Sequence, residues 1–222
     1  MCQNGWTHMT RERPSRPYRM QRRAESQDQT RLRITESAME LHGTLGPSKT
    51  SISAVAEHAG VRRSTVYRHF PDEAALFDAC SAHWAAANPP PDLAAWAAIR
   101  APDERFRIAL EELYAYYRGA ERMLDNLFRD ETISPLVEER FAALRGYFAA
   151  AQDTLLRGRK ARGVARRRAK AAIGHAIAFG TWKSLVREQG LADSEAAALM
   201  RALVRESLTG SRTPGSPGTA RP

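Results

Sequence analysis

The chain has 222 residues, with 34 basic and 25 acidic side chains and a formal net charge of +9 at pH 7. This length suits one or two compact domains with a sizeable core. No stretch of 18 residues is apolar and free of charge, so we expect no membrane span. The polar, arginine-rich beginning excludes a secretory signal, and the presence of only two cysteines fits a cytoplasmic protein without disulfides.

Both ends of the chain are poor in aliphatic residues. Residues 1–27 are rich in arginine, and residues 210–222 are rich in proline, glycine and serine. Segments that bury little apolar surface do not offset the entropy lost on ordering. We therefore predict a disordered basic arm at residues 1–27 and a disordered tail at residues 210–222.

Between these ends apolar residues recur at a spacing of three and four, which predicts an all-α fold. The first helix is expected over residues 30–43. A short second helix follows, capped by Ser51 and ended by Gly60, and the third spans about two turns at residues 63–70. Asp72 is expected to cap a fourth helix, which a run of prolines breaks. Further helices are expected at about 92–100, 103–119, 121–132, 135–157, 165–189 and 193–209.

The second and third predicted helices have the dimensions of a helix-turn-helix. Ala56 and Ala59 are small enough to let the two helices approach, and Gly60 between them can take a positive φ. The third helix is small enough to enter a major groove about 12 Å wide. Arginine matches the acceptors of guanine, and hydroxyl groups can donate to phosphates. The outward residues of the third helix are Arg63, Ser64, Thr65, Tyr67 and Arg68.

Two runs and one isolated leucine resemble the amino-terminal domain of the TetR/AcrR family of transcriptional regulators. The first run extends from Ser51 to Val61, the second from Ser64 to Phe70, and Leu76 follows. The resemblance implies a helix-turn-helix DNA-binding domain at residues 28–77 and a helical effector-binding and dimerisation domain at residues 78–209. It also implies a sequence-specific regulator, more often a repressor, that is not an enzyme and needs no cofactor.

The candidate contacts with DNA are nine residues, of which the resemblance assigns eight. Those that it would bring to bases or the adjacent sugar-phosphate are Ser53, Arg63, Ser64, Thr65 and Arg68. Arg62 is added because it belongs with Arg63 and Arg68 to a run of seven residues that contains no acid. Those that would hold the phosphate backbone are Ser51, Tyr67 and His69.

Three positions depart from the family pattern. Arg62 replaces a serine that usually caps the recognition helix, Glu73 replaces a lysine that usually attracts a phosphate, and His42 replaces a phenylalanine. These changes weaken the expected clamp on the DNA backbone. We expect the basic arm to compensate with phosphate or minor-groove contacts. Its candidate residues are Arg16, Arg19, Arg22 and Arg23.

Two late helices are apolar around almost their whole circumference, so each must be covered on two sides. We expect them to pair with their copies across a two-fold axis in a four-helix bundle, which agrees with the resemblance. Complete burial within a monomer is the alternative. Such a homodimer would read a palindromic operator through two recognition helices about 34–36 Å apart. The candidate interface residues are Ile173, Ile177, Gly180, Trp182, Leu199 and Leu203.

The middle helices are rich in aromatic residues, and the resemblance implies a small-molecule pocket among them. An apolar cavity edged by polar groups would suit a hydrophobic or amphipathic effector. Such an effector would hold the DNA-binding domains at the wrong separation, with the fourth helix as the lever. For any single aromatic residue an ordinary core position is the alternative. The candidate pocket residues are Trp84, Trp96, Phe106, Tyr114, Tyr117, Phe128, Phe148, His175 and Phe179.

Other functions remain open at this stage. The chain could be a helical ligand carrier or enzyme that retains a vestigial helix-turn-helix, or a nonspecific nucleic-acid binder. The second alternative would use the arm and the stretch from Arg157 to Lys170, which has eight basic residues and no acid and is otherwise a solvated connector. Cys80 and His83 share a helix face, but without a second ligand pair burial is favoured over a metal site.

Overall fold

The computed structural model describes residues 16–209, and in that part every regular element is helical. The predicted all-α fold is confirmed. The tail at 210–222 and residues 1–15 of the predicted arm lie outside the described residues. None of the helices in the described part is long and apolar enough to cross a membrane.

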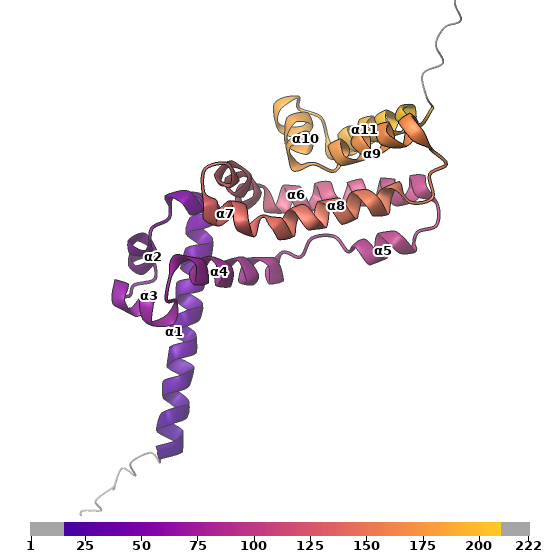
Figure 1. Cartoon of the computed structure of the whole chain (residues 1–222). Coiled ribbons are helices and arrows are strands. Elements are labelled where there is room, and N and C mark those ends of the chain that lie inside the picture. The colour runs from indigo at the N-terminus through magenta and orange to yellow at the C-terminus, as the bar shows by residue number, and fades with distance from the viewer. Residues whose placement is uncertain (1–15, 210–222) are drawn as a thin grey trace, which may run out of the picture.

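The N-terminal unit consists of one long helix and three shorter ones (Figure 1). A single 3₁₀ turn, η1, follows the long helix. The elements are α1 (Arg16–Thr44), η1 (Pro47–Lys49), α2 (Ile52–His58), α3 (Arg63–His69) and α4 (Glu73–Ala87). Caps form where the sequence predicts them: Ser51 Oγ accepts a hydrogen bond from the Ala54 amide, and Asp72 Oδ1 accepts one from the Ala75 amide.

Helix α1 is longer than predicted, because it already begins at Arg16 instead of near residue 30. The prediction of a disordered arm is therefore wrong for residues 16–27. Most residues in this stretch, such as Met20 and Ala24, have good helix propensity. A helix nucleated by a packed segment also extends without a second nucleation cost. The extension is exposed wherever its side chains are described, so it projects from the core as in Figure 1.

The core of the N-terminal unit joins all four of its α-helices. Ile34 and Ala38 of α1 are completely buried, and Val66 and Phe70 bring α3 onto the same cluster. The remaining buried members are Ile52, Val55, Ala56, Ala59, Leu76 and Cys80. Because α4 contributes Leu76 and Cys80 to this core, a movement of α4 would change the packing of the helix-turn-helix.

The C-terminal unit is a bundle (Figure 1). Its elements are α5 (Leu93–Ala98), α6 (Pro102–Glu131), α7 (Pro135–Arg140), α8 (Ala142–Leu156), α9 (Gly163–Ala176), α10 (Phe179–Lys183), the π-helical turn η2 (Ser184–Glu188) and α11 (Asp193–Leu208). Figure 1 shows α9 and α11 side by side, with α6 and α8 below them. Helices α2 and α3 lie at the opposite end of the molecule from α5.

Helix boundaries in the bundle differ from the prediction in three places. Helix α6 is continuous through Gly119, which is exposed, and the segment expected at 135–157 divides at Phe141. The segment expected at 165–189 breaks after Ala176. There the buried Tyr114 hydroxyl donates to the Ala176 carbonyl oxygen at 2.9 Å, and the Tyr117 hydroxyl donates to that of the next residue. These bonds satisfy carbonyl groups that a helix end leaves free.

Candidate DNA-binding interface and ligand cavity

The turn between α2 and α3 depends on Gly60, whose φ is +64°. Its amide donates to the Glu57 carbonyl oxygen at 3.0 Å, and the Val61 amide donates to the Ala56 carbonyl oxygen at 2.9 Å. These bonds close the C-terminus of α2, and only glycine takes this backbone conformation without strain. The turn thus fixes the angle at which α3 leaves α2.

Helix α3 presents a polar face to solvent. Arg63, Ser64 and Arg68 are exposed, Tyr67 is 41% exposed, and Thr65 is half-buried. Arg62, at the N-cap position, is exposed and makes no side-chain capping bond, while Ser51 and Ser53 are exposed at the start of α2. Seven of the nine candidate DNA contacts are therefore exposed, on α2, on α3 or at their N-cap positions.

A contact within α3 orders part of this surface. An Arg63 Nη2 donates to the Tyr67 hydroxyl oxygen at 3.3 Å, and the guanidinium lies 5.6 Å from the centre of the tyrosine ring. This bond raises the pKa of Arg63, which stays charged. The pair holds a cation and a phenol at the position where a groove or phosphate would meet α3.

His69 is placed differently from the other candidates. It is half-buried, and its Nε2 is shielded from solvent and has no hydrogen-bond partner among residues 16–209. Burial, Arg68 and Arg31 lower its pKa. Arg31 Nη1 donates to the His69 carbonyl oxygen at 2.6 Å, and its guanidinium lies 4.2 Å from the centre of the Phe70 ring. A phosphate contact through the sealed Nε2 would need a side-chain rotation, whereas Arg31, which sequence reasoning missed, already ties α1 to the end of α3.

Three polar residues of α6 bind the C-terminal end of α1, and we call them the α6 junction: Asn126, Arg129 and Asp130. Asn126 Nδ2 donates to the carbonyl oxygens of residues 42 and 43 at 3.0 and 2.9 Å. Arg129 Nη2 donates to the Leu45 carbonyl oxygen, and Asp130 Oδ2 accepts from the Ser48 amide, both at 2.8 Å. The junction satisfies main-chain groups left free where α1 ends.

Asp130 is completely buried within this junction. Burial alone would raise the pKa of its carboxyl group, but hydrogen bonds from Arg129 and Ser48 outweigh burial and lower the pKa below its ordinary value. The neighbouring Gly46 has φ of +96°, and a Cβ there would collide with the Arg129 and Asp130 side chains. The junction therefore requires glycine at position 46.

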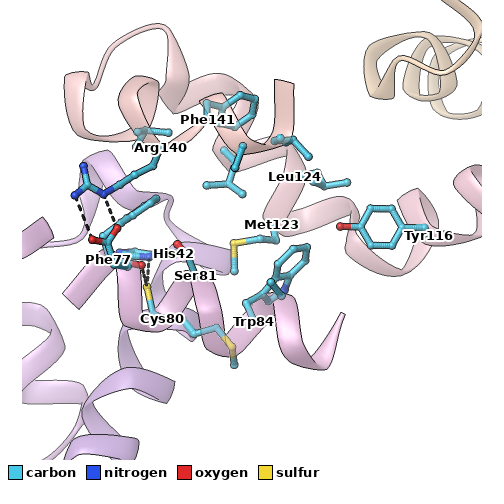
Figure 2. Close-up of a pocket in the computed structure, with 17 residues that line it drawn as sticks. His42, Phe77, Cys80, Ser81, Trp84, Tyr116, Met123, Leu124, Arg140 and Phe141 are labelled. Carbon is cyan, nitrogen blue, oxygen red and sulfur yellow. Dashed lines mark hydrogen bonds and ion pairs between the residues drawn. The ribbon is translucent and has the colours of Figure 1, made fainter. Parts of the chain in front are cut away.

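A cavity of about 340 Å³ lies between the two units (Figure 2). Helix α4 contributes Trp84 and Phe77, and α6 contributes Met123, Leu124 and Leu127. Helices α1, α7 and α8 complete the lining, which is mostly apolar. Among the nine predicted pocket residues, only Trp84 lines this cavity.

His42 and Cys80 meet at the wall of the cavity, with 3.3 Å between Nδ1 and Sγ. The thiol also donates to the Phe77 carbonyl oxygen at 3.2 Å. Burial lowers the pKa of His42 to about 4, although Asp130 opposes the shift, and burial raises the pKa of Cys80 to about 12. At neutral pH these two side chains are therefore uncharged. His83 is not the partner of Cys80.

The other predicted pocket residues divide into three groups. Trp96, Phe106, Tyr114 and Tyr117 belong to the closed core of the bundle, so their assignment to a pocket is wrong. Phe128, Phe148 and Phe179 line a separate hollow of about 390 Å³. His175 is exposed, with its Nδ1 3.3 Å from the Thr181 hydroxyl oxygen. The aromatic-rich part of the sequence therefore supplies mainly core residues and not the lining of the cavity.

The comparisons with known proteins agree with this geometry. The family model described as "Bacterial regulatory proteins, tetR family" matches residues 34–80. This span contains the buried end of α1, the complete helix-turn-helix and the first half of α4. The chain therefore carries at residues 34–80 a domain of the tetR family of bacterial regulatory proteins. It is thus a DNA-binding transcriptional regulator.

Solved structures of tetR-family and related regulators share the fold over most of the chain. A TetR-like transcriptional regulator from Rhodococcus sp. RHA1 is 18% identical, with a TM-score of 0.59, over 90% of this chain and 100% of that chain. A protein described as a fatty acid metabolism regulator from Clostridium perfringens is 12% identical, with a TM-score of 0.60, over 79% and 97%. FadR from Bacillus subtilis, solved with stearoyl-CoA, is 18% identical, with a TM-score of 0.53, over 81% and 98%. No curated protein sequence matches the chain.

The predicted dimer residues are only partly available to a second copy. Ile173, Ile177 and Trp182 are at most 2% exposed and pack in the core of their own protomer, so the prediction that they form the interface is wrong. Leu199 and Leu203 are 47% and 42% exposed on α11, and Gly180 is exposed on α10. The helix breaks after α9, between Ile173 and Trp182, and the sequence pattern alone did not show that break.

Proposed function

We propose that the chain is a homodimeric repressor that leaves its operator when an apolar or amphipathic molecule fills the cavity between α4 and α6. One observation carries this proposal. The cavity wall is shared by the unit that contains α3 and by the bundle. A ligand there interacts differently with two arrangements of the units, and only such differential affinity can shift their equilibrium.

In this proposal residues 28–77 are the DNA-binding domain, and residues 78–209 bind the effector and the second protomer. The operator contacts are the exposed α2 and α3 residues described above. Ser51 would combine its cap with a phosphate contact, because a hydroxyl that accepts from an amide can still donate its own hydrogen.

The ligand class has support from the chemistry of the wall and from similar folds. The wall is mostly apolar, and its volume lies in the range of small-molecule sites. The regulator of Bacillus subtilis with a similar fold was solved with stearoyl-CoA, and the Clostridium perfringens protein is described as a regulator of fatty acid metabolism. Long-chain acyl compounds are therefore the first candidates.

Dimerisation has support from the exposed apolar residues of α11. Leu199 and Leu203 lie one turn apart and form a stripe that a second copy can cover. A two-fold axis along this stripe would give two α3 helices for two half-sites. Ligand-driven changes in their separation then weaken binding to a palindrome.

The same wall argues against catalysis, so we propose that the chain is not an enzyme. Cysteine nucleophiles act as thiolates, usually beside a protonated histidine. Here burial raises the pKa of Cys80 to about 12 and lowers the pKa of His42 to about 4. These shifts disfavour both the thiolate and the protonated histidine. Both groups therefore stay neutral at physiological pH.

Operator release tests the proposal. Operator DNA is first selected from a random duplex pool, and its binding to the full chain is followed by fluorescence anisotropy. Stearoyl-CoA is the first probe, followed by shorter acyl chains. We expect a saturable loss of binding, and a Leu127→Trp variant, which fills the cavity, should need at least tenfold more probe.

The matched control is Ile133→Trp, which adds the same side chain at a position that is 64% exposed. It should respond to the probe like the unmodified chain. Equal probe sensitivity of all three proteins would place the effector elsewhere. A rise in transcription of the selected promoter when the chain is removed from cells would establish repression, and a fall would establish activation.

A further inference from the structure

One ion pair supplies the formal charges of the cavity wall at neutral pH. Arg140 on α7 donates from Nε to Asp78 Oδ1 at 2.5 Å and from Nη2 to Oδ2 at 3.2 Å, and its Nη1 donates to Glu139 Oε2 at 3.1 Å. His42, the other titratable base of the wall, is neutral there because of its lowered pKa. The cavity wall thus combines a long apolar surface with one guanidinium–carboxylate pair.

The charged and apolar parts are separated in space. Figure 2 shows Arg140 on one side of the cavity and Tyr116 on the other, with Trp84, Met123 and Leu124 between them. This arrangement has the polarity of a single-chain amphipath, with one charged end and one apolar body. It does not suit a molecule with charges at both ends.

The two members of the ion pair differ in exposure, and the difference selects the sign of the ligand. The Arg140 side chain is 25% exposed, whereas the Asp78 side chain is 58% exposed. A ligand anion that displaces Asp78 releases a carboxylate that water can solvate at little cost. A ligand cation would instead have to replace Arg140 on the exposed Asp78 carboxylate, where water competes with it and the gain is small.

We propose that the cavity binds an amphipath with an anionic head, and that the head takes the place of Asp78 on Arg140. This inference rests on the proposed function, because it names the ligand class of the same cavity. Arg140 is the specificity-determining residue, since its planar fork matches carboxylates and phosphates. A fatty acid supplies the first kind of head and an acyl-CoA the second.

The exchange also carries a signal. Asp78 lies on α4 and Arg140 on α7, so replacing their ion pair by a ligand contact unties α4 from the bundle. Because α4 shares a core with α3, the untied helix can reposition the recognition surface.

Isothermal titration calorimetry on the full chain tests the head-group preference with ligands that share a 12-carbon chain. The probes are dodecanoate, dodecanoyl-CoA, 1-dodecanol and dodecylammonium. We expect at least one anionic probe to bind about tenfold or more tightly than the alcohol, because a hydrogen bond to a charged group is worth about 1.5–3 kcal/mol. Dodecylammonium should bind no better than the alcohol.

Two variants separate a ligand site from a structural staple. Arg140→Gln should remove the preference for the anionic probe, while Asp78→Asn should strengthen anion binding because the internal competitor is weakened. If the ion pair only holds α4 to α7 and does not contact the ligand, both variants should change anion binding in the same direction. Arg145→Gln on α8, which removes an arginine outside the cavity wall, should leave anion binding unchanged.

The outcomes are distinct. Tight binding of dodecanoate identifies a carboxylate head, and tight binding of dodecanoyl-CoA alone identifies the phosphates, provided that Arg140→Gln abolishes either. Equal binding of anion and alcohol, or no binding of any probe, overturns the proposal. Anion binding through Arg140 without operator release would overturn the proposed function and leave the ligand class standing.

Discussion

The buried His42 makes the stability of the N-terminal unit sensitive to mild acid. Its pKa is lowered from 6.5 to about 4, first by burial and against an opposing effect of Asp130. The unfolded chain therefore takes up a proton near pH 6.5, whereas the folded chain resists protonation down to about pH 4. Protonation favours the unfolded chain, so His42 lowers the free energy of unfolding in acid. This loss is absent above pH 7 and grows as the pH falls through 6.5 toward 4.

The magnitude follows from the two pKa values. Between pH 7 and pH 5 the free energy of unfolding should fall by about 2 kcal/mol through His42 alone, since one pKa unit corresponds to about 1.4 kcal/mol. Urea unfolding at the two pH values, followed by circular dichroism, measures the loss. The comparison protein is His42→Phe, which has an apolar ring that does not titrate.

The variant is compared through its change with pH and not through its absolute stability, because it also loses the contact with the Cys80 thiol. Contributions from other titrating groups are common to both proteins and cancel. We expect the variant to lose about 2 kcal/mol less than the unmodified chain over this interval. Equal losses in both proteins would refute the reasoning about His42.

Three further predictions follow from the described contacts. Arg68→Ala should weaken operator binding by about tenfold and flatten its salt dependence in anisotropy titrations, while Arg167→Ala on α9, which is not among the operator contacts, should change neither. Leu199→Glu should shift the chain to a monomer in light scattering, because a charge on the exposed α11 stripe opposes pairing. Gly46→Ala should lower the free energy of unfolding by about 1–3 kcal/mol more than Gly60→Ala, because both have positive φ but only the first meets the α6 junction; equal losses would contradict this.

The helix-turn-helix was predictable because its determinants are local. Ser51 and Asp72 cap the helices that follow them, and Gly60 supplies the positive φ of the turn. Each of these features depends on a few neighbouring residues, so reading the sequence is enough to find them. The polar face of α3 follows from the same register, with Val66 turned inward.

The cavity and the dimer face were not predictable in the same way, because long-range contacts decide them. Tyr114 and Tyr117 satisfy carbonyl oxygens some 60 residues away and so favour the end of α9, which no local signal marks. Ile173 before this break and Trp182 after it both lie in the core. The cavity wall likewise comes from helices far apart in sequence, and its defining cation, Arg140, looks like any surface arginine when read alone.

The N-terminal unit is connected to the bundle at two places, through the α6 junction at the end of α1 and through the ion pair between α4 and α7. We expect the weaker connection to yield when a ligand binds. The α6 junction holds the end of α1 through two hydrogen bonds to main-chain groups and the turn after it through two more. Leaving a buried group such as the His42 carbonyl without its partner costs about 1–3 kcal/mol. Helix α4 faces α6 across the cavity, and its ion pair with α7 involves a carboxylate that is more than half exposed, a kind of contact worth about 0–1 kcal/mol. We therefore expect a ligand to displace α4 and to leave α1 in place.

Asp78→Asn tests this division in the absence of any ligand. The variant loosens α4 without touching the α6 junction, so it should weaken operator binding by a few-fold, up to about fivefold for a pair worth 1 kcal/mol. Anisotropy titrations measure the change, and Asp153→Asn, which breaks an exposed pair between α8 and α9, is the matched control. If Asp78→Asn binds the operator as tightly as the control does, the tie between α4 and α7 does not set the position of α3.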